Sequence, residues 1–173
     1  MIIWLNGPFG VGKTTTVLEL RQVLPTAVVF DPEEIGFMLR HALGGGLPEG
    51  DFQDLRLWRR LTIAAIEEVA DYFERDVIVP QSVLVERYWD ELRYGLAAAG
   101  LDCHSVTLHS AKEELERRIM KDEFTTGARD WRLSHIDSYE AAMPWLRATT
   151  AVIDTTDITS EHVATKVMEA VTR

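Results

Sequence analysis

A glycine-rich segment that directly follows a short apolar run constrains this chain more than any other feature. Residues 7–14 read Gly-Pro-Phe-Gly-Val-Gly-Lys-Thr, which completes the pattern G-x-x-x-x-G-K-[ST], and a helical pattern follows. An ordinary glycine turn between a strand and a helix also contains glycines, but it requires neither the lysine nor the threonine. The segment therefore predicts a loop whose backbone N–H groups and helix N-terminus bind phosphate, here called the P-loop.

Each residue type in the P-loop suits a phosphate chain. Glycines allow the backbone N–H groups to curl around a β-phosphate, and the Lys13 ammonium group reaches the β- and γ-phosphate oxygens. The hydroxyl group of Thr14 is placed to coordinate Mg²⁺. We therefore expect a nucleotide to be bound by Gly7, Phe9, Gly10, Val11, Gly12, Lys13, Thr14 and Thr15.

Short apolar runs alternate with longer helical patterns along the chain. A helix is clearest over residues 54–73, where apolar side chains recur at three- and four-residue steps. Such alternation is typical of repeated βαβ units, in which helices cover both faces of a parallel sheet. We therefore predict an α/β fold with five strands, at residues 2–5, 27–30, 77–80, 103–109 and 151–153.

The length and the charge of the chain limit its partners. Its 173 residues suit one domain, residues 1–173. With 18 Lys and Arg against 28 Asp and Glu, the net charge is −10, so the surface repels nucleic acid backbones and anionic membranes. No apolar run reaches the length of a membrane span, and a lone cysteine, Cys103, excludes an internal disulfide. We expect a cytoplasmic protein that binds no nucleic acid and holds anions only at local positive potential.

Residues that follow the strands are candidates for the site, because parallel strands end at the edge of the sheet where the P-loop lies. Asp31 follows the second strand, and two roles fit it equally well. It can act as a general base or as a partner of Mg²⁺. It can also cap a helix, since Pro32 and Glu34 complete a capping pattern. No acidic residue follows the third strand, so Mg²⁺ would rely mainly on Thr14, phosphates and water.

A polar segment at about residues 123–135 has the composition of a short lid. Arg118, Arg129 and Arg132 lie before and within it, and guanidinium groups there can neutralise charge on a transferring phosphoryl group. The alternative is a solvated helix face with pairs such as Glu114 and Arg118. A second glycine-rich stretch, residues 44–48, fits either a hinge or a passive loop.

These segments together resemble the tunicamycin resistance proteins, a branch of P-loop small-molecule kinases related in fold to nucleoside monophosphate, shikimate and chloramphenicol kinases. The resemblance covers nearly the whole chain. It is carried by residues 4–14, 30–33, 36–37, Arg40, 51–53, 57–59 and 78–80. It implies a three-layer P-loop NTPase fold with strand order 2-3-1-4-5, and it implies binding of ATP with Mg²⁺.

The resemblance also implies a function and a set of acceptor residues. The implied function is ATP-dependent phosphotransfer to a small nucleoside- or sugar-containing molecule, which confers tunicamycin resistance. The implied acceptor residues are Asp31, Arg40, Asp51, Gln53 and Gln81, while Arg118 and Thr155 would lie near the adenine. Trp58 fits either the core or a ring that stacks on the acceptor, and Arg40 and Arg59 fit either a solvated surface or a grip on the acceptor.

Two questions stay open in the sequence. Related kinases often carry a second arginine four residues after the one that matches Arg118, but this chain has Asp122 there. The arginine at the γ-phosphate is therefore either Arg129 or Arg132. A non-catalytic, nucleotide-gated protein that sequesters its ligand, or a regulatory ATPase, would also carry the P-loop. Either kind of protein can be a monomer or a homodimer.

Overall fold

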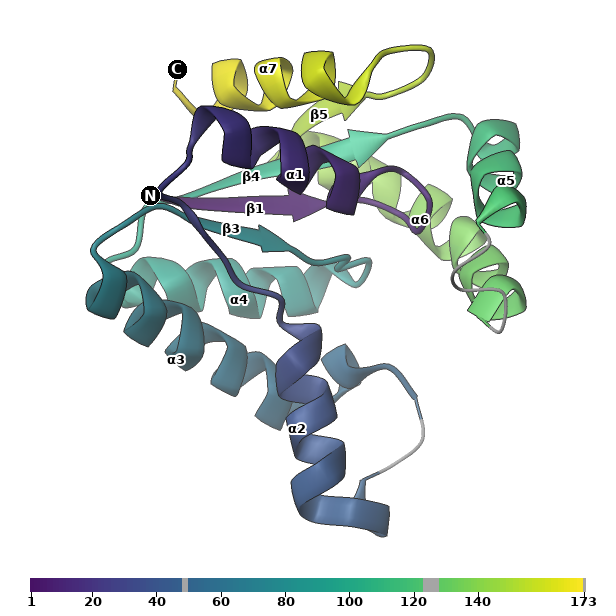
Figure 1. The fold of residues 1–173 in the computed structure, drawn as a ribbon. Coiled ribbons are helices and arrows are strands. Elements are labelled where there is room, and N and C mark those ends of the chain that lie inside the picture. The colour runs from purple at the N-terminus through teal and green to yellow at the C-terminus, as the bar shows by residue number, and fades with distance from the viewer. Residues whose placement is uncertain (48–49, 123–127, 173) are drawn as a thin grey trace.

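The computed structural model describes residues 1–47, 50–122 and 128–172. Five parallel strands form one sheet in the order β2-β3-β1-β4-β5, as Figure 1 shows. This order and direction confirm the prediction. The strands are β1 (Ile2–Asn6), β2 (Val28–Val29), β3 (Val77–Pro80), β4 (Cys103–His109) and β5 (Ala151–Asp154).

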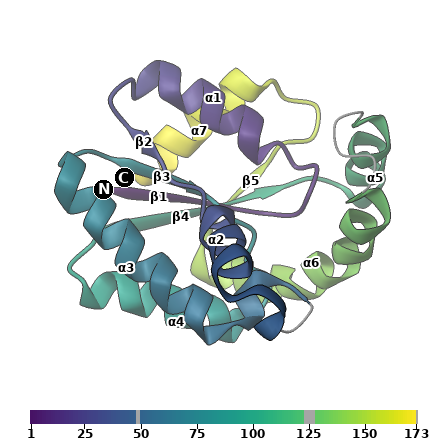
Figure 2. The same cartoon turned by 60° about the horizontal axis from the view of Figure 1, so that its bottom comes forward.

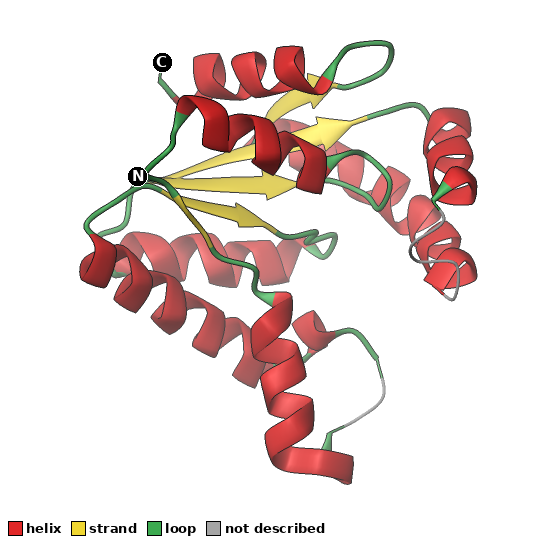
Figure 3. Cartoon of the chain, viewed as in Figure 1, coloured by secondary structure: helices red, strands yellow, loops and turns green. Residues whose placement is uncertain are grey.

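Helices lie on both sides of the sheet, so the fold has three layers (Figure 3). Figure 2 shows α1 and α7 on one side, with α3, α4 and α6 on the other. The helices are α1 (Lys13–Val23), α2 (Glu33–Leu43), α3 (Arg56–Phe73), α4 (Glu86–Ala98), α5 (Lys112–Lys121), α6 (Arg129–Thr149) and α7 (Ser160–Val171), with short 3₁₀ turns η1 (Gly44–Gly46) and η2 (Phe52–Asp54).

Alternation along the central strand β1 divides the core into two clusters. Ile3 and Leu5 pack with residues of α1 and α7, whereas Ile2 and Trp4 pack with residues of α3 and α4. Successive side chains of a strand point to opposite faces, so a strand with helices on both sides must be apolar throughout. The sheet is thereby anchored from both faces, and its carboxyl-terminal edge is held in place for the site.

Trp58 belongs to the second of these clusters. Its side chain is fully buried, and its indole N–H donates a hydrogen bond to the carbonyl oxygen of Pro32 at 2.9 Å. The proposed stacking of Trp58 on an acceptor ring is therefore wrong. Instead, Trp58 on α3 fixes the residue that precedes α2, because a buried indole N–H requires a partner.

Several boundaries differ from the predicted ones. The helix expected over residues 54–73 begins at Arg56, because Asp51 accepts a hydrogen bond from the Gln53 backbone N–H and starts the turn η2 instead. The expected lid is in part the beginning of a helix of 21 residues, α6, and its residues 123–127 lie outside the described residues. In the second glycine-rich stretch, Gly44–Gly46 forms η1 and Pro48 lies outside the described residues. None of the helices in the described ranges is long and apolar enough to cross a membrane.

Replacement of Gly36 with alanine is expected to destabilise the fold. Gly36 lies inside α2, where a Cβ atom would overlap the ring of Phe52. Because η2 must shift to make room, we expect a loss of about 1–3 kcal/mol in the free energy of unfolding, measured by denaturant titration. Gly46→Ala is the matched control, since no atom lies within 4 Å of its Cβ position. Equal stability of the two variants would show that η2 does not depend on this contact.

Candidate nucleotide and acceptor site

The P-loop connects β1 to α1 and depends on its glycines. Gly7, Gly10 and Gly12 have φ angles of 134°, 78° and 101°, a region that side chains with a Cβ atom rarely adopt. A Cβ atom on Gly7 would lie 2.5 Å from the carbonyl oxygen of Leu108 on β4, whereas nothing lies within 4 Å of that position on Gly12. The loop is therefore packed tightly against the sheet at one end and open at the N-terminus of α1, which is the end that can receive phosphate.

Lys13 is held by acceptors of the protein itself. Its Nζ donates hydrogen bonds to the carbonyl oxygens of Gly7 (2.9 Å) and Pro8 (3.0 Å) and to Ser82 Oγ (2.8 Å). The Ser82 hydroxyl in turn donates to the same Gly7 oxygen at 2.7 Å. Burial lowers the pKa of Lys13 to about 8, with a smaller effect of Arg132 in the same direction, against the carboxylates of Glu33 and Asp31.

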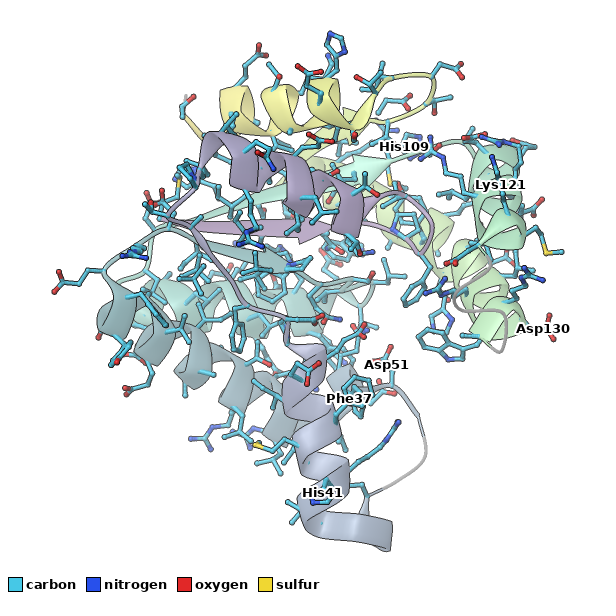
Figure 4. The ribbon with its side chains drawn as sticks, in the orientation of Figure 1. Phe37, His41, Asp51, His109, Lys121 and Asp130 are labelled. Atoms are coloured by element: carbon cyan, nitrogen blue, oxygen red, sulfur yellow. The ribbon has the colours of Figure 1, made fainter. Side chains whose placement is uncertain are left out.

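A cavity of about 890 Å³ opens in front of the P-loop. It lies between the P-loop, α2, η2 and the beginning of α6, and Figure 4 shows Asp51 and Phe37 on its α2 side. The predicted residues that line it are Phe9, Gly10, Gly12, Lys13, Thr14, Thr15, Asp31, Arg40, Asp51, Gln53, Gln81, Arg118 and Arg132. The expected nucleotide and acceptor residues therefore share one cavity.

Other predicted residues lie beside this cavity. A smaller hollow of about 260 Å³ is lined by Val11 and Thr155, together with Gly10, Gly12, Thr15 and Arg118. Arg118 joins the two spaces, because it lines both. Gly7 is buried behind the loop and contributes its carbonyl oxygen to Lys13. Trp58 and Arg129 do not line either space.

The structure shows the capping alternative for Asp31, and its role as a base or as a partner of Mg²⁺ stays a prediction. Its Oδ1 accepts a hydrogen bond from the Glu33 backbone N–H at 2.9 Å, so the carboxylate caps the start of α2. The same residue is exposed and lines the cavity. Glu33 lies next to it on the cavity wall, and burial together with the Asp31 charge raises the pKa of the Glu33 carboxyl, against Lys13 and Arg132.

A network of hydrogen bonds holds the acceptor side of the cavity. Gln53 Nε2 donates to Asp51 Oδ2 at 2.8 Å and to the Ser82 carbonyl oxygen at 3.3 Å. Arg59 is buried and donates to the Gln53 carbonyl oxygen, and it forms an ion pair with Glu91 at 2.6 Å. Arg59 thus neither extends into solvent nor grips a ligand, and it holds η2 against α4.

The arginines on the opposite side are already paired. Arg118 contacts Glu114 Oε1 at 2.7 Å and Thr155 Oγ1 at 3.2 Å, so the expected pair on the surface of α5 forms together with a contact to the β5 loop. Arg132 Nη1 donates to Asp122 Oδ2 at 2.7 Å. Arg129 donates to the Asp122 backbone oxygen at 2.9 Å and does not line the cavity, whereas Arg132 does, so the geometry favours Arg132 over Arg129 at a γ-phosphate.

The oxygen donors at this site suit Mg²⁺. The Thr14 hydroxyl and the Asp31 carboxylate both line the cavity, and hard oxygen ligands are the ones that Mg²⁺ prefers. Within residues 1–47, 50–122 and 128–172, no three His, Cys, Asp or Glu side chains cluster as a metal site. The residues therefore fit an ion that is held largely by phosphates and water, and magnesium binding stays a prediction.

Sequence reasoning did not place Glu33, Phe37, Phe52, Asp122 and Trp131 at the site, although all five line the cavity. The sequence holds one pattern that could have placed residues of α2 at the site. Glu33, Phe37 and Arg40 follow each other at four- and three-residue steps, which puts them on one face of a helix that begins at a strand end. For Trp131 the signal is its ring contact with Phe9 of the P-loop, at 4.7 Å between centroids, and this contact exists only in the fold.

Binding of a nucleotide at alkaline pH is expected to take up a proton. With a pKa of about 8, Lys13 is partly neutral in the free protein, and a phosphate chain favours its charged form. We expect uptake of about half a proton at pH 8, rising toward about 0.9 at pH 9. Calorimetry in buffers of different ionisation enthalpy measures this uptake. Lys13→Met is the control, and equal uptake by both proteins would contradict the assignment.

Proteins similar to this chain are found among solved structures. No protein-family model and no curated protein sequence matches the chain. The chain is similar to a sugar kinase from Janibacter (20% identity, TM-score 0.68, 99% of this chain and 94% of that one). It is also similar to the APS kinase of Mycobacterium tuberculosis, solved with AMPPNP and APS (19% identity, TM-score 0.65, 99% and 97% covered). These two likenesses show a P-loop kinase fold.

A third structure is more similar in sequence. The tunicamycin resistance protein of Deinococcus radiodurans shares 31% identity with this chain at a TM-score of 0.72, over 97% of this chain and 93% of the other. At this identity and coverage, the chain belongs to the tunicamycin resistance protein family.

Proposed function

We propose that the protein is an ATP-dependent phosphotransferase that acts in the cytoplasm on a hydroxyl group of a small nucleoside- or sugar-containing molecule, and that this reaction confers resistance to tunicamycin. The observation that carries the proposal is the shared cavity, in which Lys13 of the P-loop faces the carboxylates of Asp31 and Glu33. Its 890 Å³ is near the upper end of the range for small-molecule sites, which suits two ligands together.

The nucleotide would occupy the P-loop side. Backbone N–H groups of the loop and the N-terminus of α1 would hold the phosphates, and Arg118 and Thr155 would flank the adenine. When held by the Thr14 hydroxyl group, phosphates and water, Mg²⁺ would supply positive charge to the phosphate oxygens. Lys13 would exchange its hydrogen bonds to Gly7, Pro8 and Ser82 for phosphate oxygens.

The acceptor would occupy the side formed by α2 and η2. Its hydroxyl oxygen would form a bond to the γ-phosphorus, the bond from that phosphorus to the bridging oxygen would break, and ADP would leave. The hydroxyl proton would pass to the Asp31 carboxylate, which lines the cavity and faces solvent. Lys13 and Arg132 would stabilise the charge that develops on the phosphoryl oxygens.

A direct test is the mass of the product. Purified protein with Mg-ATP and tunicamycin, nucleosides or nucleotide sugars should yield one acceptor-dependent product that is heavier by one phosphoryl group, together with an equal amount of ADP. ADP that forms equally well without an acceptor would indicate a regulatory ATPase. Bound ATP and acceptor without any product would contradict transfer.

One observation favours the alternative of a nucleotide-gated protein that sequesters tunicamycin. Asp122 occupies the position where related kinases often carry an arginine, and it pairs with Arg132, an arginine that lines the cavity. On this alternative, resistance of cells would persist after loss of the Asp31 carboxylate, provided that tunicamycin still binds. Loss of resistance with unchanged binding would reject sequestration.

A further inference from the structure

The α2 and η2 side of the cavity presents hydrogen-bond acceptors almost exclusively. Asp31, Glu33 and Asp51 contribute carboxylates to this wall. Gln53 and Gln81 contribute amide oxygens, since the Nε2 groups of both donate to the carbonyl oxygen of Ser82. Each Oε1 is buried without a hydrogen-bond partner among the residues that the structure describes. Buried polar atoms of this kind call for a partner, so a donor group of a ligand that reaches them would be favoured.

The charge of this wall also disfavours an anionic ligand. Within the described ranges, Arg40 is the one cation that α2 and η2 themselves contribute against these three carboxylates. Arg40 is exposed, donates to the Gly50 carbonyl oxygen at 3.2 Å and lies over the Phe52 ring at 4.2 Å from its centroid. Lys13 and Arg132 act on Glu33 from across the cavity, at the P-loop and on α6. An anionic group at the α2 wall would therefore meet repulsion from the nearest carboxylates.

Two aromatic side chains supply an apolar surface to the same space. Phe37 on α2 is 49% exposed and Trp131 on α6 is 47% exposed, and both line the cavity. Phe37 is held edge to face by Phe52, and Trp131 is held against Phe9 of the P-loop. Exposed ring faces of this kind pack against the flat apolar face of a sugar or a nucleobase.

From these observations we infer that the acceptor is an uncharged or cationic molecule rich in hydroxyl or amino groups, with at least one flat ring, and that the wall excludes acceptors that carry phosphate, sulfate or carboxylate. This inference rests on the proposed function for the identity of the two sides of the cavity. It makes Glu33 a determinant of specificity, because Glu33 lines the cavity and its side chain forms no hydrogen bond to any described residue.

Calorimetry on the protein saturated with Mg-AMPPNP tests the inference. The probes are tunicamycin, uridine, 5′-amino-5′-deoxyuridine and uridine 5′-monophosphate, of which the last three share one ring and differ in charge. We expect uridine and its amine to bind at least about tenfold more tightly than the monophosphate. Glu33→Gln should reduce this ratio about fivefold, and Glu33→Lys should reverse it.

Glu34→Gln is the matched control, because Glu34 is the next residue of α2 but is exposed and does not line the cavity. The ratio should stay unchanged in this variant, and thermal unfolding should show that all three variants fold. Tighter binding of the monophosphate than of uridine by the unmodified protein would overturn the inference. It would also be overturned by an unchanged ratio in folded Glu33→Lys, or if neither tunicamycin nor any uncharged or cationic probe binds.

The same probes separate this inference from the proposed function. Selective binding of uridine or tunicamycin without a phosphorylated product would support the inference and contradict transfer. A phosphorylated product from the monophosphate but not from uridine or tunicamycin would support transfer and overturn the inference.

Discussion

Protein with Lys13→Ala is expected to fold normally and to lose its phosphotransfer activity, with kcat/KM lower by at least about a thousandfold. Lys13 is the cation of the P-loop, and its Nζ lies among oxygens that a phosphate chain would replace. The free protein should not lose stability at neutral pH, because burial of the ammonium group disfavours its charged form, as the lowered pKa shows. Product formation and thermal unfolding of the same preparation measure both effects.

Lys166→Ala is the matched control, since Lys166 is an exposed residue of α7 that lines neither the cavity nor the smaller hollow. Its activity should equal that of the unmodified protein. Activity of Lys13→Ala within tenfold of the unmodified protein would contradict a role of Lys13 at the phosphates. Loss of activity together with loss of folding would instead assign Lys13 to the structure of the loop.

Replacement of Asp31 with asparagine is expected to lower kcat by about 100- to 10,000-fold while the affinities for nucleotide and acceptor change little. An asparagine Oδ1 can still accept the hydrogen bond from the Glu33 backbone N–H, so the cap of α2 survives. The amide cannot take up the proton of the acceptor hydroxyl. Single-turnover kinetics and calorimetry on the same variant separate the two effects.

Comparison with Asp31→Ala separates the role of Asp31 as a helix cap from its role as a proton acceptor. Alanine removes both the cap and the proton acceptor, so this variant should add a loss of about 1 kcal/mol in the free energy of unfolding to the loss of turnover. A value of kcat within threefold of normal in Asp31→Asn would show that another group accepts the proton. Glu33 is then the residue to test, because it lines the cavity beside Asp31 and its pKa is raised.

The general fold could be predicted because its signals are local. Strands covered on both faces leave uninterrupted apolar runs, and the P-loop motif marks the turn from β1 to α1. The order of the strands came from the resemblance to a family, since no local pattern specifies which strands become neighbours. The short strand β2 and the turn η2 were placed less well, because a hydrogen bond from Asp51 decides where α3 begins.

The site was predictable where one segment carries its chemistry, and less so where distant segments meet. Lys13 and Thr14 follow from the motif. Ser82 meets Lys13 across 69 positions of sequence, and the pairing of Arg132 with Asp122 depends on how α5 and α6 approach each other. Trp58 and Arg59 were ambiguous for the same reason, since their partners Pro32 and Glu91 lie on other elements. Burial of such side chains is a property of the assembled fold.

The two outer strands of the sheet also affect how strongly the protein resists aggregation at high concentration. An edge strand offers unpaired backbone groups to a neighbouring molecule, and long flat edges promote aggregation. Here β2 has two residues and β5 has four, so either edge offers few backbone groups to another chain. With a net charge of −10, copies of the chain also repel one another. The sheet thus opposes edge-to-edge pairing by its own geometry.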